Sequence, residues 1–217
     1  MLTGRTVVGA EGYQKNHLKA NDYYEKNREV KGYWLGEACE LYGVKAGEEV
    51  SEEAFEALRT NRHAVTGEQI TRRQNTTRQE SDGEIVTNRR AFYDFVFSKT
   101  FSILAVTLGN ETVKAWHDFA VRTAVKEMEQ WTARRDHKNP ESHVEITGKF
   151  AAAWYKHDAN RMQEPNLHDH IVIFNMTPSK DDRSYAIEPR TFYERTKYLS
   201  AIYRDTLAKQ AIDAGCY

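Results

Sequence analysis

Short runs of apolar residues in the second half of the chain predict a set of strands. Phe92–Phe97 (FYDFVF) and His168–Met176 (HDHIVIFNM) are dense in aromatic and β-branched residues, as strands are. Val144–Ile146 and Phe150–His157 predict a hairpin that turns at Thr147-Gly148. We therefore expect a sheet in which neighbouring strands run antiparallel.

Helical periodicity is clearest from Thr112 to Arg135, where apolar residues recur every three to four positions and predict one long helix. A second helix is predicted to close the chain over Thr191–Ala214. Shorter helices are predicted at three further places: Gly12–Glu29, Gly36–Tyr42 and Ser51–Leu58. Strands with helices between and after them predict the α+β class, a sandwich with a mainly antiparallel central sheet flanked by helices.

Composition narrows the class of protein. The 217 residues are 40% hydrophobic and 29% charged, which is typical of one globular domain. No run approaches the roughly 20 apolar residues of a membrane span, so we expect a cytoplasmic protein without membrane insertion. Cys39 and Cys216 form no paired spacing and predict neither a disulfide framework nor a cysteine metal site. With a net charge of −1, phosphate binding would need a local basic patch.

Three histidines form a candidate metal site. His168 and His170 alternate along a predicted strand, which puts both imidazoles on one face about 7 Å apart. His157 ends the preceding apolar strand, and a hairpin would bring it beside the other two. Three imidazoles leave coordination positions open, as in catalytic sites for Zn, Mn, Ni or Cu. A His-x-His pair alone is more often two ordinary polar residues at a strand end.

One aspartate and one pair of tyrosines also carry candidate chemistry. Asp94 interrupts an apolar strand, where a buried carboxylate needs a partner. A hydrogen bond to a metal-bound histidine would supply that partner, and exposure on a solvated sheet face is an equal alternative. Tyr23 and Tyr24 are adjacent in a polar segment. A tyrosine hydroxyl can attack phosphorus to give a covalent phosphotyrosine, although adjacent tyrosines often only pack at the edge of a core.

These motifs together carry a family resemblance. The segment VEITGKFAAAWYKHDANRMQEPNLHDHIVIFNMT, from Val144 to Thr177, resembles the three-histidine signature of the MobF (TrwC/TraI-like) conjugative relaxases, members of the HUH endonuclease superfamily. That signature is approximately TG, an apolar strand ending in HD, an Arg, DP-x-LHxH, an apolar strand and N-x-T. FYDFVFS resembles the family's DLTFS strand, NDYYEK its tyrosine-pair region, and Trp34-Leu35-Gly36 its W-x-G.

The resemblance implies a bacterial, metal-dependent DNA endonuclease and strand transferase. Such an enzyme nicks single-stranded DNA beside a hairpin at a transfer origin and stays attached to the 5′ phosphate through a tyrosine. It would work with Mg or Mn, with Zn, Ni or Cu as alternatives, and with relaxosome accessory proteins and a coupling protein. The implied metal ligands are His157, His168 and His170, and the implied aspartate is Asp94. Candidate DNA-backbone contacts are Arg72, Arg73, Arg78 and Arg161.

The chain departs from the family at the nucleophile. MobF relaxases typically carry two tyrosine pairs near the N-terminus, whereas this chain has Tyr23-Tyr24 and an isolated Tyr13. Counting back from Trp34 puts the first pair, usually the nicking one, near positions 15 and 16, close to Tyr13. We rank Tyr23 first because a surviving pair more naturally retains the nucleophile, followed by Tyr24 and then Tyr13. The family also implies that residues 1–217 form one relaxase domain, followed in a longer protein by a helicase.

Three other functions remain open at this stage. A rolling-circle replication initiator or transposase would use the same histidines and tyrosine on a different origin. A module that has lost the first tyrosine pair would bind DNA without cutting it. A non-haem metal oxygenase, from a different class, would use histidine and carboxylate ligands but neither the tyrosines nor the arginine-rich segment.

Overall fold

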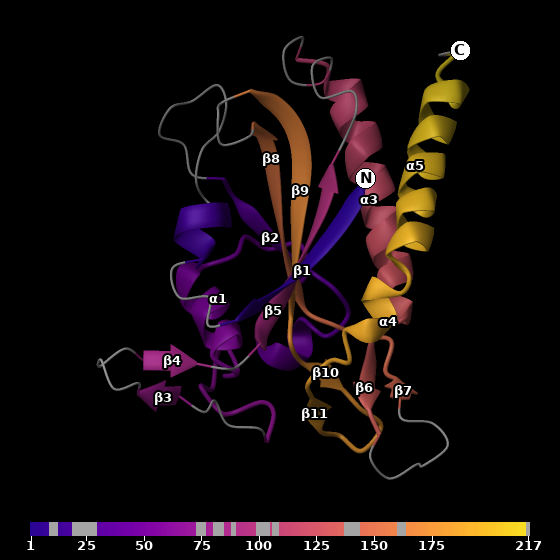
Figure 1. Cartoon of the computed structure of the whole chain (residues 1–217). Coiled ribbons are helices and arrows are strands. Elements are labelled where there is room, and N and C mark those ends of the chain that lie inside the picture. Colours follow the sequence, from indigo (N-terminus) through magenta and orange to yellow (C-terminus); the bar gives the residue numbers. More distant parts are fainter. Residues whose placement is uncertain are drawn as a thin grey trace.

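A five-stranded antiparallel sheet forms the centre of the protein, in the order β1-β5-β9-β8-β2 (Figure 1). The computed structural model describes residues 1–8, 13–18, 30–72, 77–79, 85–87, 90–98, 105, 109–136, 144–159 and 164–215. The central strands are β1 (Leu2–Val8), β2 (Gly32–Leu35), β5 (Arg90–Ser98), β8 (Ala152–Ala159) and β9 (Pro165–Phe174). The predicted α+β class with a mainly antiparallel sheet is confirmed.

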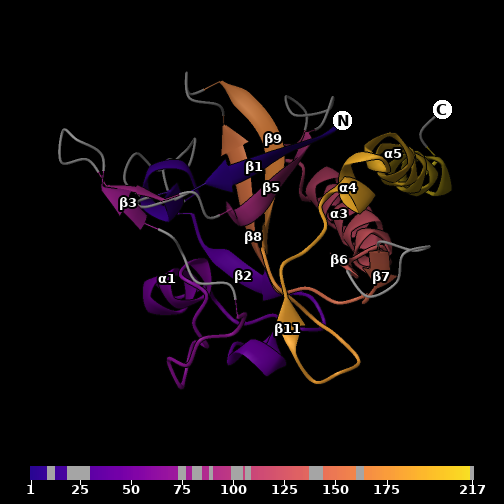
Figure 2. The same cartoon turned by 60° about the horizontal axis from the view of Figure 1, so that its bottom comes forward.

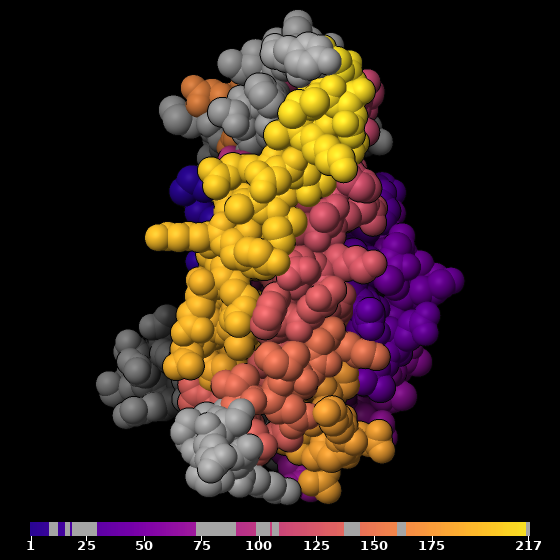
Figure 3. All heavy atoms as spheres, turned by 90° about the vertical axis from the view of Figure 1, so that its right-hand side faces the viewer, coloured from indigo at the N-terminus to yellow at the C-terminus, as the bar shows by residue number. Residues whose placement is uncertain are grey.

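Helices cover both faces of the sheet. One face packs against α3 (Glu111–Gln130), α4 (Arg190–Tyr193) and α5 (Thr196–Asp213), and Figure 3 looks onto α5 where it lies beside α3. The other face is covered by α1 (Glu52–Arg59), a π-helical turn η1 (Gln14–Leu18) and a 3-10 turn η2 (Glu40–Tyr42). In the described part of the chain, three two-stranded antiparallel pairs lie outside this sheet: β3 (Thr77–Gln79) with β4 (Ile85–Thr87), β6 (Ala133–Arg135) with β7 (Val144–Ile146), and β10 (Thr177–Pro178) with β11 (Ser184–Tyr185) (Figure 1). Figure 2 shows β3, β6, β7 and β11 from another side.

Alternation along the central strands supplies two separate cores. On β9, Ile171 and Ile173 face α3 and α5, while Val172 and Phe174 face α1. Phe55 of α1 packs edge-on against Phe174, with ring centroids 5.2 Å apart. Because both faces of β9 are covered, a polar residue at its centre must find its partners inside the protein.

The start of α1 follows the sequence prediction. Ser51 caps the helix, and its hydroxyl accepts a hydrogen bond from the Ala54 N–H at 3.1 Å. Ser51→Ala removes that acceptor, so we expect the free energy of unfolding to fall by about 1 kcal/mol. Urea denaturation measures the change, and Ser51→Thr, which keeps the hydroxyl, should retain most of the stability. Equal losses in the two variants would show that the cap is not the cause.

The predicted hairpin between residues 144 and 157 is wrong. The long helix ends at Gln130 rather than Arg135, because residues 133–135 form β6 and pair with β7. Val144–Ile146 is therefore paired outside the central sheet, while β8 pairs with β2 and β9. The chain does turn at Gly148, where φ is +71°, but the turn joins two different sheets. The apolar pattern of two runs that are close in sequence does not show which strand each of them pairs with.

Other helices differ from the prediction in extent. The closing helix is split into α4 and α5 around Glu194, and only the last three residues of the helix predicted over 36–42 are helical, ending at Gly43 with φ +81°. Of the helix predicted over 12–29, the described residues are 13–18, which are helical, and the rest lies outside the described residues. The strands β1 and β2 were not predicted: β1 buries only Leu2 and shows no alternation, and β2 does alternate but has only four residues.

Candidate active site

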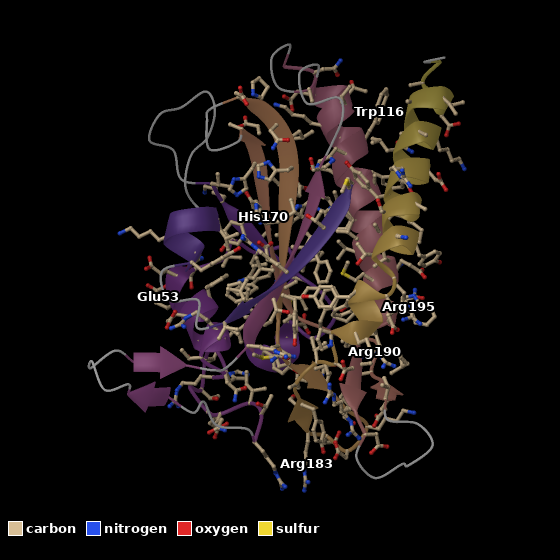
Figure 4. All side chains as sticks on the ribbon, viewed as in Figure 1. Glu53, Trp116, His170, Arg183, Arg190 and Arg195 are labelled. Atoms are coloured by element: carbon tan, nitrogen blue, oxygen red, sulfur yellow. The ribbon has the colours of Figure 1, made fainter. Side chains whose placement is uncertain are left out.

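Three histidines meet on the α1-facing side of the sheet, where β8 and β9 pair. His157 and His168 are cross-strand partners, and His170 follows two residues later on the same face. The ring of His157 lies 5.1 Å from each of the other two rings, and those two are 5.3 Å apart between centroids. In Figure 4, His170 lies on the sheet between Glu53 of α1 on one side and Trp116 of α3 on the other. The hairpin expected to gather the three imidazoles is present.

A polar group holds one ring nitrogen of each histidine. The Nδ1 of His170 lies 2.9 and 3.0 Å from the two carboxylate oxygens of Asp94, and the Nδ1 of His168 lies 2.7 Å from the Asn166 carbonyl. His157 bonds to the backbone of Leu18, and its buried Nε2 has no hydrogen-bond partner. Histidines that bind metals are typically held in this way through the nitrogen that faces away from the ion.

Burial favours the neutral imidazole at two of the three histidines, His157 and His168. Burial, helped by the charges of His170 and His168, lowers the pKa of His157 to about 3. Burial also lowers the pKa of His168. The neutral form is the one that coordinates metals. As the rings stand, no group of three or more ligand-type side chains in the described part of the chain is spaced to hold an ion. Coordination therefore requires the rings to draw together by side-chain rotation.

Asp94 joins the histidine cluster to the N-terminal segment. Its side chain is completely buried, so the alternative that it faces solvent is wrong. Besides His170, it accepts a hydrogen bond from the hydroxyl of Tyr13 at 2.7 Å and from the Arg5 guanidinium at 3.0 and 3.2 Å. Burial alone would raise the pKa of Asp94, but its bond to His170 and the groups of Tyr13 and Arg5 outweigh burial and lower it. The carboxylate is therefore ionised at neutral pH.

Tyr13 is held with its hydroxyl at this carboxylate. Its ring packs edge-on against Phe92 with centroids 5.0 Å apart, and the Arg5 guanidinium donates a hydrogen bond to its hydroxyl. Burial and then the nearby Asp94 charge raise the pKa of Tyr13 above its ordinary value, while Arg5 opposes that shift. Tyr13 is thus a protonated phenol with an acceptor in place, and forming its phenolate would need additional positive charge.

The turn that follows Tyr13 is fixed by a close approach to the sheet. Gln14 donates a hydrogen bond to the Tyr155 hydroxyl at 2.7 Å, and the Tyr155 ring lies against Gly32. A Cβ at Gly32 would stand 2.5 Å from a ring atom of Tyr155, so only glycine leaves the ring its place. The chain of contacts from Gly32 through Tyr155 to Gln14 therefore helps to set where Tyr13 points.

The remaining predicted site residues stay predictions. Tyr23, Tyr24, Arg73 and Arg161 lie outside the described residues, as does the side chain of Arg78 on β3, and Arg72 is exposed. Sequence reasoning missed Arg5 and Gln14, whose roles depend on contacts with residues 80 or more positions away. The one available signal was the position of Gln14 immediately after a candidate nucleophile.

The fold and this set of side chains define a relaxase-type α+β domain. The family model described as TrwC relaxase matches residues 8–217. The multifunctional conjugation protein TraI of Escherichia coli is 28% identical over 174 residues, which are 79% of this chain and 9% of TraI, and TraI of strain K12 is 28% identical over 172 residues. The chain thus spans about a tenth of the length of these curated relatives.

Solved structures agree with the family match. A copper-bound structure of the conjugative relaxase TrwC in complex with oriT DNA has a TM-score of 0.78 and 25% identity, covering 99% of this chain and 71% of that one. A metal-free TrwC complex with oriT DNA has a TM-score of 0.77 and 26% identity, covering 99% and 70%. The chain belongs to the TrwC relaxase family. Among the described residues, no helix is both long and apolar enough to cross a membrane.

Proposed function

We propose that this domain nicks one strand of DNA at a conjugative transfer origin and holds the cut strand through a tyrosine. The observation that carries the proposal is that Asp94 contacts both a histidine of the cluster and the hydroxyl of Tyr13. One buried carboxylate therefore contacts both the candidate nucleophile, whose proton it can accept, and the candidate metal centre. Single-stranded DNA beside a hairpin is the proposed substrate, with relaxosome accessory proteins and a coupling protein as proposed partners.

In the proposed reaction, the tyrosine oxygen attacks the phosphorus of the scissile phosphodiester. The bond from phosphorus to the 3′ oxygen breaks, and water protonates that oxygen, so the upstream fragment leaves with a free 3′ hydroxyl. The downstream fragment stays attached to the tyrosine through its 5′ phosphate. Asp94 is 2.7 Å from the Tyr13 hydroxyl and can take its proton. Arg5, which contacts the same hydroxyl, favours the phenolate by its charge. These contacts favour Tyr13 over the first-ranked Tyr23.

We propose a divalent metal ion, Mg or Mn in function, as the cofactor of the three histidines. The orphaned Nε2 of His157 and the neutral state of His157 and His168 fit such an ion. When bound, the ion would polarise the scissile phosphate and neutralise the charge that develops on it. His170 would be oriented by Asp94, His168 by the Asn166 carbonyl and His157 by the Leu18 backbone.

The family match disfavours two of the alternatives. A replication initiator or transposase would share the chemistry but not a TrwC relaxase match over residues 8–217, and an oxygenase would share neither. An inactive DNA-binding module has the same fold and needs a chemical test. The pKa of Tyr13, raised by burial and by Asp94, makes that test necessary, because the phenol is not activated by its protein neighbours alone.

The test is covalent capture of DNA. The protein is incubated with Mn²⁺ and a 3′-labelled single-stranded DNA pool with a randomised core, which is enriched over several rounds for strands that remain bound in SDS. We expect a labelled protein–DNA band that EDTA abolishes and Mn²⁺ restores, together with a common sequence at the captured 5′ ends. DNA that binds reversibly in every round without a covalent band would identify an inactive module instead.

A further inference from the structure

Asp169 lies between two histidines of the candidate metal centre but faces the opposite side of the sheet. Alternation along β9 turns its side chain towards α3 and α5, on the same face as Ile171 and Ile173. The carboxylate is completely buried there. An ionised group without partners is costly in such a core, and an aliphatic residue would be the default. The contacts of Asp169 therefore indicate the role of this carboxylate.

Two side chains contact this carboxylate, and a third is connected to it through one of them; Figure 1 labels the elements that carry them. Trp154 of β8 donates its indole N–H to Oδ2 at 2.6 Å. The Nε2 of His117, on α3, lies 3.1 Å from Oδ1, although the two atoms are not aligned as a hydrogen bond. The Nδ1 of His117 lies in turn 2.7 Å from the hydroxyl of Tyr203 on α5. A buried polar chain thus runs from β8 and β9 through α3 to α5.

The polar chain lies behind the last regularly paired residues of β8 and β9, next to an irregular part of their ladder. The pairing of β8 with β9 shifts register between His157 and Ala159, immediately beside the cross-strand pair of His157 and His168. Such a shift interrupts the ladder locally and bends the strand. The bond from Asp169 to Trp154 crosses from β9 to β8 on the rear face, within the regular pairs that precede this shift. It is a side-chain connection between the two strands next to the point where their backbone pairing becomes irregular.

A second contact ties the same place to α3. Lys156, the cross-strand partner of Asp169, forms an ion pair with Asp118 of α3 and lies 4.4 Å from the centre of the Trp154 ring. Arg122 of α3 also stacks on that ring, at 4.5 Å. Hydrogen bonds and ion pairs fix direction more strictly than apolar packing does, because they weaken when misaligned. The rear face of the histidine hairpin is therefore held by directional contacts.

We propose that Asp169 is a positioning residue for the metal centre. Its contacts with Trp154 and His117 fix the segment of β9 that carries His168 and His170 relative to the segment of β8 that carries His157. The separation and angle of the three imidazoles then depend on a carboxylate that never touches the ion. This inference rests on the proposed metal-binding role of the histidines, and it adds a group outside the histidine cluster that sets their geometry.

Cobalt binding tests the proposal, because the visible spectrum of Co²⁺ reports the geometry of its ligands. In the metal-free full chain titrated with Co²⁺, we expect Asp169→Asn and Trp154→Phe each to weaken binding about tenfold or more and to change the Co²⁺ absorption bands. The double variant should be little worse than either single one, because both remove the same contact. Glu129→Gln is the matched control, since Glu129 is a buried carboxylate that bonds to the Glu37 and Phe150 N–H groups instead.

The metal-free protein gives a second readout. The side-chain ¹⁵N signals of His157, His168 and His170 should shift in Asp169→Asn and stay in place in Glu129→Gln. Unchanged histidine signals and an unchanged Co²⁺ spectrum in a folded Asp169→Asn variant would overturn the proposal and leave Asp169 a group of the core only. A wild-type chain that binds no Co²⁺ would instead refute the proposed metal centre, and the histidine signals would still decide whether Asp169 positions the rings.

Discussion

Replacing Tyr13 by phenylalanine is expected to abolish the covalent protein–DNA product. The substitution removes only the hydroxyl that donates to Asp94, while the ring keeps its edge-on contact with Phe92. If Tyr13 is the nucleophile, no other group can take over its attack, and the rate should fall by a factor on the order of 10⁴ or more. The measurement is the rate at which 3′-labelled DNA becomes resistant to SDS in the presence of Mn²⁺.

Binding must survive for this result to identify a nucleophile. Tyr13→Phe should remain folded, since a lost hydroxyl bond costs only about 1 kcal/mol of stability, and it should bind the captured DNA and Co²⁺ within about fivefold of the wild type. Tyr33→Phe, at an exposed position on β2, is the matched control and should react normally. Tyr23→Phe and Tyr24→Phe are run in parallel. If Tyr13→Phe forms the covalent product at the full rate and Tyr23→Phe does not form it, then Tyr23, the tyrosine ranked first from the sequence, is the nucleophile.

The part of the site that could be predicted from sequence is the part encoded locally. His168 and His170 share a face because side chains alternate along any strand, and His157 reaches them because β8 and β9 are consecutive and form a hairpin. Asp94 was recognisable as a charge within an apolar strand. None of these inferences needed the identity of a distant partner, so local pattern was sufficient.

The remainder depends on pairings that no local pattern encodes. Arg5 reaches Asp94 because β1 pairs with β5, which lies about ninety residues further along the chain. β6 leaves the predicted helix because it pairs with β7 and not because its own residues disfavour a helix. Asp169 shows the same limit, because alternation placed it on the face away from the histidines but gave no hint of His117 or Tyr203. Local propensity is a weak guide wherever tertiary packing decides.

Replacing Asp94 by asparagine is expected to damage both metal binding and the proton transfer. The amide keeps the size of the side chain but loses the charge that holds His170 and accepts from Tyr13. Loss of the group that orients a metal-binding histidine typically lowers metal affinity about 10–100-fold, and loss of a proton acceptor lowers the rate about 10²–10⁴-fold. Co²⁺ titration measures the first effect, and the rate of covalent capture at saturating Mn²⁺ measures the second.

Saturating metal separates the two roles of Asp94. Excess Mn²⁺ should restore occupancy in Asp94→Asn but leave the rate low, because the proton acceptor is still missing. Glu129→Gln, which changes a buried carboxylate that bonds to the Glu37 and Phe150 N–H groups and not to the histidine hairpin, should lose neither. Full recovery of the rate by metal would limit Asp94 to orienting His170.

The pH dependence of stability gives a further check on Asp94. Because the folded-state pKa of Asp94 is lowered, its ionised form stabilises the fold above about pH 3.8. The stability gap between wild type and Asp94→Asn should therefore be fully present at neutral pH and narrow as pH falls through the folded-state pKa.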